Sequence, residues 1–199
     1  MEKVATRGRP REFDVEEALS AALRVFWTKG YESASLTDLT EAMGITRPSL
    51  YAAFGNKEDL FKSALDLYKR EKLAYIGEAV SAPTAREAAA NLLEGAIATI
   101  TEGECRGCMG VIATVTCGTE DEAIRSHLDR IGRDSHNALI DRMQAGIDAG
   151  EFPAGADAEV TTQFLLTVLR GLSVQAQAGL SAAELRQVAD ATMAMWPSQ

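Results

Sequence analysis

The chain of 199 residues has few aromatic residues, few cysteines and no long uncharged apolar run. Aromatic residues make up 6% of it and runs of alternating β-branched residues are scarce, which disfavours a β-sheet protein. Three cysteines are too few for a disulfide framework and favour a reducing compartment. Because no stretch approaches the roughly 18 apolar residues of a membrane span and no basic-then-apolar leader opens the chain, membrane insertion and secretion are disfavoured. We therefore predict a cytoplasmic protein without a membrane partner.

The motifs of common enzyme classes are also absent from the sequence. There is no Gly-x-Ser-x-Gly elbow, no His-Glu-x-x-His pair and no phosphate-binding glycine loop followed by Lys and Ser or Thr. The adjacent acids Glu120, Asp121 and Glu122 are better explained as a favourable helix N-terminus than as catalytic carboxylates. We therefore predict a protein that is not an enzyme and needs no cofactor.

The charged residues are distributed unevenly along the chain, whose net charge is −9. Residues 1–72 carry 12 Lys and Arg and 12 Asp and Glu, so the whole acidic excess lies in residues 73–199. Cations dominate the first eleven residues, namely Lys3, Arg7, Arg9 and Arg11. A basic arm on a neutral segment, followed by an acidic segment, indicates two parts with different partners.

Helix start and stop signals recur along the whole chain. In six places Ser, Thr, Asp or Asn is followed three residues later by Glu or Asp, which is the pattern of a capping box. These places begin at Asp14, Ser35, Asn56, Thr84, Thr119 and Ser181. Glycines that suit left-handed helix ends follow the helical runs at Gly30, Gly44, Gly150 and Gly179. With apolar residues at helical spacing, these signals predict an all-α fold of about nine helices. The predicted helices are 14–29, 36–43, 47–54, 57–76, 85–102, 107–117, 120–149, 157–178 and 182–195.

The two short helices at 36–43 and 47–54 carry the most specific pattern. A tight turn at Gly44 joins them, which is the helix-turn-helix arrangement whose second helix enters the major groove of DNA. Leu50 and Phe54 lie four residues apart and should face the core of the domain, whereas Pro48 and Ala52 should point the opposite way. The second helix is therefore predicted to present an outward face to a duplex.

Side chains around the second helix offer contacts to bases and to phosphates. Arg47 could donate to guanine O6 and N7, and Pro48 could contact a thymine methyl group. Tyr51 could donate to a phosphate, unless its ring is half-buried in the core, and Lys57 and Thr37 could bind phosphates at helix starts. The basic arm fits either a minor-groove insert or a solvated tail. The predicted DNA-binding residues are Arg9, Thr37, Thr46, Arg47, Pro48, Ser49, Tyr51 and Lys57.

Three runs around these helices form a continuous pattern. They are Ser35-Leu36-Thr37-Asp38-Leu39, Ala42-Met43-Gly44-Ile45-Thr46 and Leu50-Tyr51-x-x-Phe54-x-Asn56-Lys57-Glu58-x-Leu60. With these runs, residues 7–68 resemble the DNA-binding domain of TetR/AcrR-family transcriptional regulators. The resemblance implies a homodimer that binds a palindromic double-stranded DNA operator and releases it when a small ligand enters the C-terminal domain. It further implies a three-helix DNA-binding domain at 1–56, a connecting helix at 57–76 and an effector-binding and dimerisation domain at 77–199.

The helix predicted at 157–178 has two apolar faces. One face carries Val160, Phe164, Val168 and Gly171, and an adjacent face carries Leu165, Leu169 and Leu172. Two apolar faces on one helix indicate burial on two sides, for example against the core and against a partner subunit. Together with the last helix, this helix resembles the four-helix dimer seam of the family.

Apolar side chains of the second part could line a cavity for a small organic effector. The predicted lining residues are Cys108, Met109, Ile112, Val115, Met143, Phe164 and Val168. The alternative is that these side chains form ordinary helical core.

The cysteines Cys105, Cys108 and Cys117 lie close together in the sequence. Zinc binding is disfavoured because no second Cys-x-x-Cys follows and the only histidines, His127 and His136, lie elsewhere, predicted to face solvent on the long helix without a role. The sequence therefore predicts no metal site. Arg106 beside the pair could lower a thiol pKa and make the cysteines redox- or electrophile-sensitive. The alternative is that these cysteines are small buried hydrophobic residues.

These observations favour a ligand-responsive DNA-binding regulator, most simply a repressor released from its operator by a small organic effector. Two alternatives stay open. One is a thiol-based sensor on the same DNA-binding platform, and the other is a helical ligand carrier that does not bind DNA.

Overall fold

The computed structural model describes residues 13–103, 105–116 and 121–197, and these residues form ten α-helices and no strand. The helices are α1 (Val15–Ser33), α2 (Leu36–Met43), α3 (Arg47–Phe54), α4 (Lys57–Lys72), α5 (Ala74–Val80), α6 (Ala85–Ile100), α7 (Met109–Thr116), α8 (Glu122–Asp148), α9 (Ala158–Gln177) and α10 (Ala182–Ala194). The all-α prediction is confirmed. Arg9 and Cys117 lie outside the described residues. No helix of the described residues has both the length and the apolar character to cross a bilayer.

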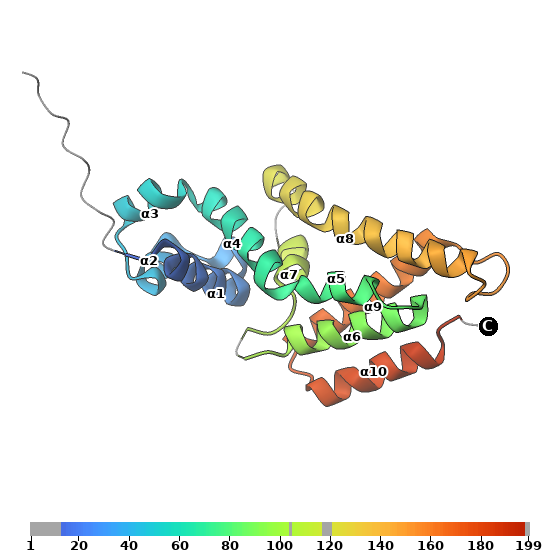
Figure 1. Cartoon of the computed structure of the whole chain (residues 1–199). Coiled ribbons are helices and arrows are strands. Elements are labelled where there is room, and N and C mark those ends of the chain that lie inside the picture. The colour runs from blue at the N-terminus through green and yellow to red at the C-terminus, as the bar shows by residue number, and fades with distance from the viewer. Residues whose placement is uncertain (1–12, 104, 117–120, 198–199) are drawn as a thin grey trace, which may run out of the picture.

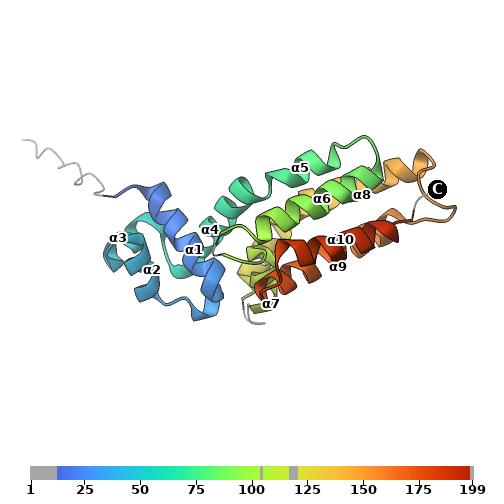
Figure 2. The ribbon, with the colours of Figure 1, turned by 90° about the horizontal axis from the view of Figure 1, so that it is seen from below.

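The molecule is elongated, with two groups of helices at its ends. Figure 1 shows α1, α2 and α3 at one end, the four helices α6, α8, α9 and α10 at the other, and α4 leading from one group to the other. Figure 2 shows α6, α9 and α10 running along the second end, where they contact one another. The arrangement therefore consists of a small helical unit joined through α4 to a helical bundle.

The capping signals set most of the helix starts. Reciprocal capping boxes form at Ser35, Asn56, Thr84 and Ser181, as predicted. At the start of α1, Asp14 accepts hydrogen bonds from the amides of Glu16 and Glu17 without a return bond. The predicted start at Thr119 lies outside the described residues, and Asp121 is the N-cap residue of α8. Since each cap satisfies free amides of a first turn, these residues define where the chain enters each helix.

The helix predicted at 57–76 is divided in the structure, which gives ten helices instead of nine. It ends at Lys72, and α5 begins at Ala74 after Leu73, whose φ is −107° and ψ 10°. The change of direction lets Tyr75 and Ala79 pack into the bundle against α6, where Gly95 leaves room for the Tyr75 ring. The break thus comes from packing, because no Pro or Gly in the sequence marks it.

Each end of the molecule has its own core cluster of buried residues. The first joins α1, α2, α3 and α4 and includes Ile124 of α8, and the second joins α5, α6, the rest of α8, α9 and α10. Helix α7 belongs to the part predicted as the effector domain, but its residues Met109, Ile112 and Ala113 are buried in the first cluster. Helix α7 therefore packs the predicted effector domain against the core of α1 to α4.

Asp38 in the first turn of α2 gives the fold an acid-sensitive contact. The Lys29 ammonium, 2.7 Å away, and then the Ser35 amide and hydroxyl lower the pKa of Asp38 from 3.8 to about 2. A folded-state pKa below the unfolded value stabilises the fold above the unfolded pKa, and the contribution is lost as the pH falls through the folded pKa.

We therefore expect Asp38→Asn to lower the free energy of unfolding at about pH 5 and to have a much smaller effect at about pH 2.5. Urea unfolding of both proteins at the two pH values measures the difference. An equal loss at both values would show that the carboxylate charge contributes nothing.

Candidate nucleic-acid interface

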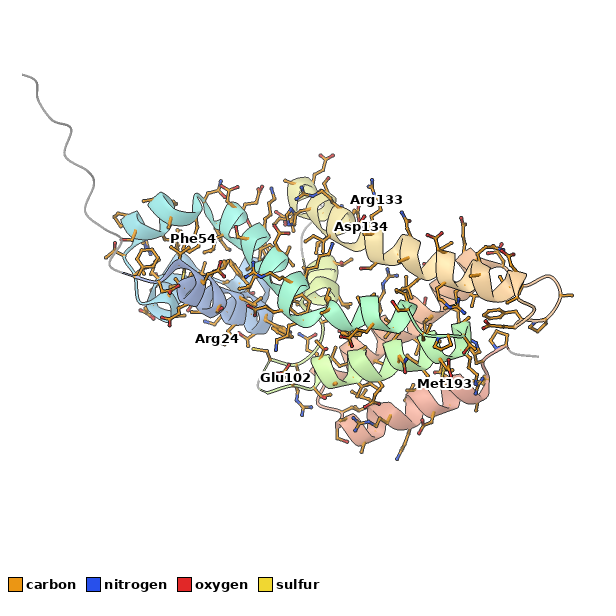
Figure 3. The ribbon with its side chains drawn as sticks, viewed as in Figure 1. Arg24, Phe54, Glu102, Arg133, Asp134 and Met193 are labelled. Atoms are coloured by element: carbon orange, nitrogen blue, oxygen red, sulfur yellow. The ribbon has the colours of Figure 1, made fainter. Side chains whose placement is uncertain are left out.

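The helix pair α2–α3 is held in a fixed geometry by its turn and its inward side chains. Gly44 ends α2 with a φ of 65°, a left-handed conformation that suits glycine, and its amide donates to Glu41 O at 3.2 Å. On α3, Leu50 is fully buried in the first core, and Phe54 packs partly buried against the same core (Figure 3). The predicted inward face of α3 is confirmed.

The opposite face of α3 is open to solvent. Arg47, Pro48 and Ala52 are exposed, and the Tyr51 side chain is 49% exposed, which is unusual for an aromatic ring of this size. The predictions that Pro48 and Ala52 point outward and that this surface is not packed under the chain are therefore confirmed. An exposed helical face with an arginine and a tyrosine is suited to the major groove.

Polar contacts arrange the N-terminal end of α3. Arg47 donates from its guanidinium to Thr37 Oγ1 at 2.8 Å, which joins two of the predicted DNA-binding residues. Thr46 is the N-cap of α3, and its hydroxyl accepts from the Ser49 amide at 3.3 Å and lies 3.0 Å from Ser49 Oγ. Thr46 and Ser49 thus have a structural part in fixing the helix start, and their contacts to DNA stay a prediction.

Lys57 is placed at the start of α4 by an aromatic cluster. Its ammonium lies 3.4 Å from Glu32 O and 4.6 Å from the centroid of the Tyr31 ring. The centroids of the Tyr31 and Phe61 rings lie 4.9 Å apart. Phe61 contacts Phe26 edge-on, with the two ring centroids 4.8 Å apart. The Lys57 ammonium therefore lies over a cluster of aromatic rings that packs α1 against α4.

The residues before α7 connect three helices. The Trp27 indole N–H on α1 donates to the carbonyl of Gly107 at 2.8 Å, and the Trp27 ring contacts Tyr68 of α4 edge-on at 4.8 Å. The Cys108 amide donates to Ser173 Oγ on α9 at 2.7 Å. Gly107 has a φ of 82°, and a Cβ there would lie 3.2 Å from the Ser173 carbonyl oxygen, so this close approach requires glycine. We call Gly107 and Cys108 the joint, because they link α1 and α4 to α9.

The prediction that His127 faces solvent is wrong. The side chain on α8 is 7% exposed, with Nε2 lying 2.9 Å from Asp66 Oδ1 on α4. Arg130 donates to Nδ1 at 2.6 Å, so Nδ1 is the acceptor and the Nε2–H group donates to Asp66 Oδ1. The His127 side chain is buried because the first half of α8 packs on α4. Both ring nitrogens have hydrogen-bond partners, Asp66 on α4 and Arg130 on α8. Nearby, Lys69 Nζ lies 3.9 Å from Asp134 of α8 (Figure 3).

The predicted pocket residues lie in several places. Met109 and Ile112 are buried in the first core, Met143 is buried in the second, and Val168 packs half-buried against the second. The side chain of Val115 lies outside the described residues. Phe164 is 42% exposed and lines an outward groove between α8 and α9, together with the half-buried His136. The structure therefore does not bring Phe164 together with the methionines, and a common effector cavity stays a prediction.

The cysteine segment differs from its prediction in one contact. Cys105 and Cys108 are both half-buried. Arg106, predicted to act on a thiol, instead donates to the Leu180 carbonyl at 3.0 Å. Among the described residues no group of three His, Cys, Asp or Glu side chains is arranged to hold a metal ion.

One exposed face of α9, on the outer surface of the bundle, is mostly apolar. The α9 stripe consists of Val160, Phe164, Thr167, Gly171 and Val174, which follow one helical face and are all exposed. On the other side of the same helix, Leu165 and Leu172 are buried in the second core. The two-faced character predicted for this helix is confirmed on its core side. Val188 of α10 and Met195, the C-cap of α10, are also exposed apolar side chains.

The fold and the open α3 face define a helix-turn-helix transcriptional regulator with a helical C-terminal domain. Residues 18–64 match the family described as bacterial regulatory proteins, tetR family, and residues 86–192 match a tetracyclin repressor-like C-terminal domain. The chain belongs to the TetR family of bacterial transcriptional regulators, as the sequence runs predicted, and it is not an enzyme.

The chain is also similar to individual members of this family. It is 32% identical to the HTH-type transcriptional repressor ComR of Escherichia coli (strain K12), with 96% of this chain and 93% of ComR covered. It is 34% identical to the HTH-type transcriptional repressor BdcR of the same strain, with 89% and 86% covered. A solved structure of the TetR family regulator CifR, a cysteine mutant complexed with 26-bp double-strand operator DNA, matches with a TM-score of 0.87 and 44% identity. That match covers 96% of this chain and 100% of that one.

Proposed function

We propose that this chain is a cytoplasmic homodimeric repressor that binds a palindromic operator and releases it when a small organic effector acts on the C-terminal domain. The observation that carries the proposal is the exposed α3 face, held outward by the buried Leu50. The similar proteins named as repressors, and CifR in its complex with operator DNA, support it.

The α9 stripe supports the dimer. Val160 is 68% exposed and Phe164 42%, and an apolar helix face of this length in water favours a partner surface. Gly171 on the same stripe has no atoms near the position of a Cβ, which leaves room for a facing helix to approach closely. Two copies paired through this face would present two α3 helices, which a palindromic site requires about 34–36 Å apart.

The joint and the α4–α8 contact support control from the C-terminal domain. Any change in the position of α9 is transmitted to Trp27 on α1 through the Ser173 and Gly107 hydrogen bonds. A second path runs from α8 to α4 through His127 and Asp66. In one arrangement of the dimer the two α3 helices have the spacing that the operator requires, and in another they do not. An effector that binds the second arrangement more tightly lowers operator affinity, and the ratio of its affinities for the two arrangements sets the size of the decrease.

The direct test is operator binding by the full-length protein, using DNA from the region beside its own gene and random DNA of the same length. Affinity for both should fall steeply between about 50 and 200 mM salt, because phosphate contacts release counterions. Arg47→Ala should weaken binding to the preferred site by about 1–3 kcal/mol and relax its specificity. Fluorescence anisotropy measures both quantities.

Lys57→Ala is the matched control, because it also removes one cation, at the start of α4. It should weaken operator and random DNA alike, as expected for a phosphate contact. An equal loss on both DNAs for Arg47→Ala would contradict base reading by α3. Absence of salt-dependent DNA binding by the unmodified protein would instead favour the ligand carrier.

A further inference from the structure

The Arg47 side chain is exposed, and yet one contact holds it against the neighbouring helix. Its guanidinium donates from Nη2 to Thr37 Oγ1 at 2.8 Å, ten positions earlier in the chain. Thr37 is in the first turn of α2 and Arg47 is the first residue of α3, and these two helices contact each other at one end of the molecule (Figure 1). Both side chains are exposed, so the contact follows from the angle between the helices and not from burial.

The acid that adjoins Thr37 in the sequence does not compete for this guanidinium. Asp38 Oδ1 lies 2.7 Å from the Lys29 ammonium of α1, and Asp38 Oδ2 accepts from the amide and the hydroxyl of Ser35. Arg47 itself forms no salt bridge with any carboxylate of the described residues. The Thr37 hydroxyl is neutral and accepts one hydrogen bond, so it orients the guanidinium without cancelling its charge or using its other N–H donors.

The rest of the outward face of α3 has little capacity for hydrogen bonds to bases. Pro48 and Ala52 are exposed and have no polar side-chain atom. The Ser49 hydroxyl lies 3.0 Å from the hydroxyl of the N-cap residue, so it is engaged at the helix start. Tyr51 offers a single hydroxyl. The Arg47 guanidinium is the group on this face that has several donors in one plane, the arrangement that matches O6 and N7 of guanine.

We propose that Thr37 is a positioning residue for base recognition, because its hydroxyl holds Arg47 in the orientation in which the guanidinium reads one guanine in each half-site. This inference rests on the proposed function, since it assigns part of the operator specificity of the same repressor. The predicted phosphate contact of Thr37 is compatible with this role, because a hydroxyl that accepts from Arg47 keeps its own hydrogen for a phosphate oxygen.

A positioning contact of this kind acts on specificity. A long arginine side chain loses conformational freedom when it binds a base, and a contact that orders the side chain beforehand removes this cost. Without the Thr37 hydroxyl, the cost falls on the complex in which Arg47 binds guanine, whereas on another base pair Arg47 stays unordered and no cost arises. Discrimination between the two sequences therefore decreases. A phosphate contact, by comparison, contributes equally on every sequence.

The test begins with the selection of preferred sites from a pool of random duplexes by the unmodified full-length protein. Fluorescence anisotropy then gives the affinity for the selected duplex and for versions with one base pair changed in both half-sites. We expect guanine at one position of each half-site, preferred over adenine by about 5- to 150-fold, the range for a bidentate arginine contact. Arg47→Ala should remove this preference and leave the preferences at other positions.

Thr37→Val is the decisive variant, because it keeps the shape of the side chain and removes the hydroxyl. It should lower the guanine preference at the same position by about 2- to 10-fold, the equivalent of ordering one long side chain. Thr37→Ser keeps the hydroxyl and should retain most of the preference. In the Arg47→Ala background Thr37→Val should have no further effect on discrimination, since the group that it positions is gone.

Thr40→Val is the matched control, because the Thr40 hydroxyl belongs to the same helix and donates to the Leu36 carbonyl at 2.8 Å. This variant should keep the guanine preference, and circular dichroism checks that all variants are folded. Affinity of Thr37→Val that is lower on all duplexes alike, with the preference intact, would overturn the proposal, as would a selected site without a guanine that depends on Arg47. Equal binding of the unmodified protein to every duplex, or to none, would contradict the proposed function itself, so the two failures are distinguishable.

Discussion

The double substitution Phe164→Glu/Val174→Glu is expected to separate the dimer and to abolish high-affinity operator binding. Both side chains belong to the exposed α9 stripe, so a carboxylate at each position puts four like charges into the paired surface. A single chain contacts one half-site, and operator affinity should fall by about a thousandfold, the lower end of the difference between specific and non-specific binding. Analytical ultracentrifugation measures the mass in solution, and anisotropy measures the affinity.

Ala145→Glu is a suitable control, because it places one carboxylate of the same kind on an exposed position of α8 outside the stripe. This variant should stay dimeric and should bind operator normally. A double variant that is folded, dimeric and fully active would show that the subunits pair through another surface. Circular dichroism of both variants separates loss of pairing from loss of folding.

The α2–α3 pair is predictable from the sequence because its determinants are local. The Thr46 cap, the Gly44 turn and the inward Leu50 each act within a few residues, and both helices have the predicted bounds. The contact from Arg47 to Thr37 was not part of that prediction, because it depends on the angle between the two helices.

Features that depend on contacts between distant segments were missed. His127 and its partner Asp66 are 61 positions apart, and helical periodicity alone does not show that α8 packs its first half on α4. The break at Leu73 has the same origin, since the following segment turns to pack on α6. In both places tertiary packing overrides the local signal.

The α9 stripe shows a different limit of sequence reasoning. Spacing indicates that Val160, Phe164 and Gly171 share one face, but it does not show what covers that face. The same spacing supported both a cavity lining and a subunit surface for Phe164. Its exposure in the single chain, on an outward groove, favours the subunit surface.

Phe61→Ala is expected to lower the free energy of unfolding by about 3–5 kcal/mol, the usual cost of deleting a buried phenylalanine ring. Phe61 is 1% exposed and contacts the rings of Phe26 and Tyr31 at 4.8 and 4.9 Å. Because native proteins are stable by only about 5–15 kcal/mol, this loss leaves a large unfolded fraction at moderate temperature. Denaturant unfolding at one fixed protein concentration measures it, since dimers gain stability with concentration.

The effect on DNA binding should exceed the effect of unfolding alone. Phe61 supports the Tyr31 ring, and Tyr31 supports the Lys57 ammonium, so the deletion also loosens a predicted phosphate contact. Phe61→Leu fills most of the space and should cost less than about 1.5 kcal/mol, with operator affinity close to that of the unmodified protein. If Phe61→Ala instead lowers the free energy of unfolding by less than about 1 kcal/mol, the aromatic cluster is not what holds α1 against α4. The positions of Lys57 and α3 would then depend on the capped helix starts at Asn56 and Thr46.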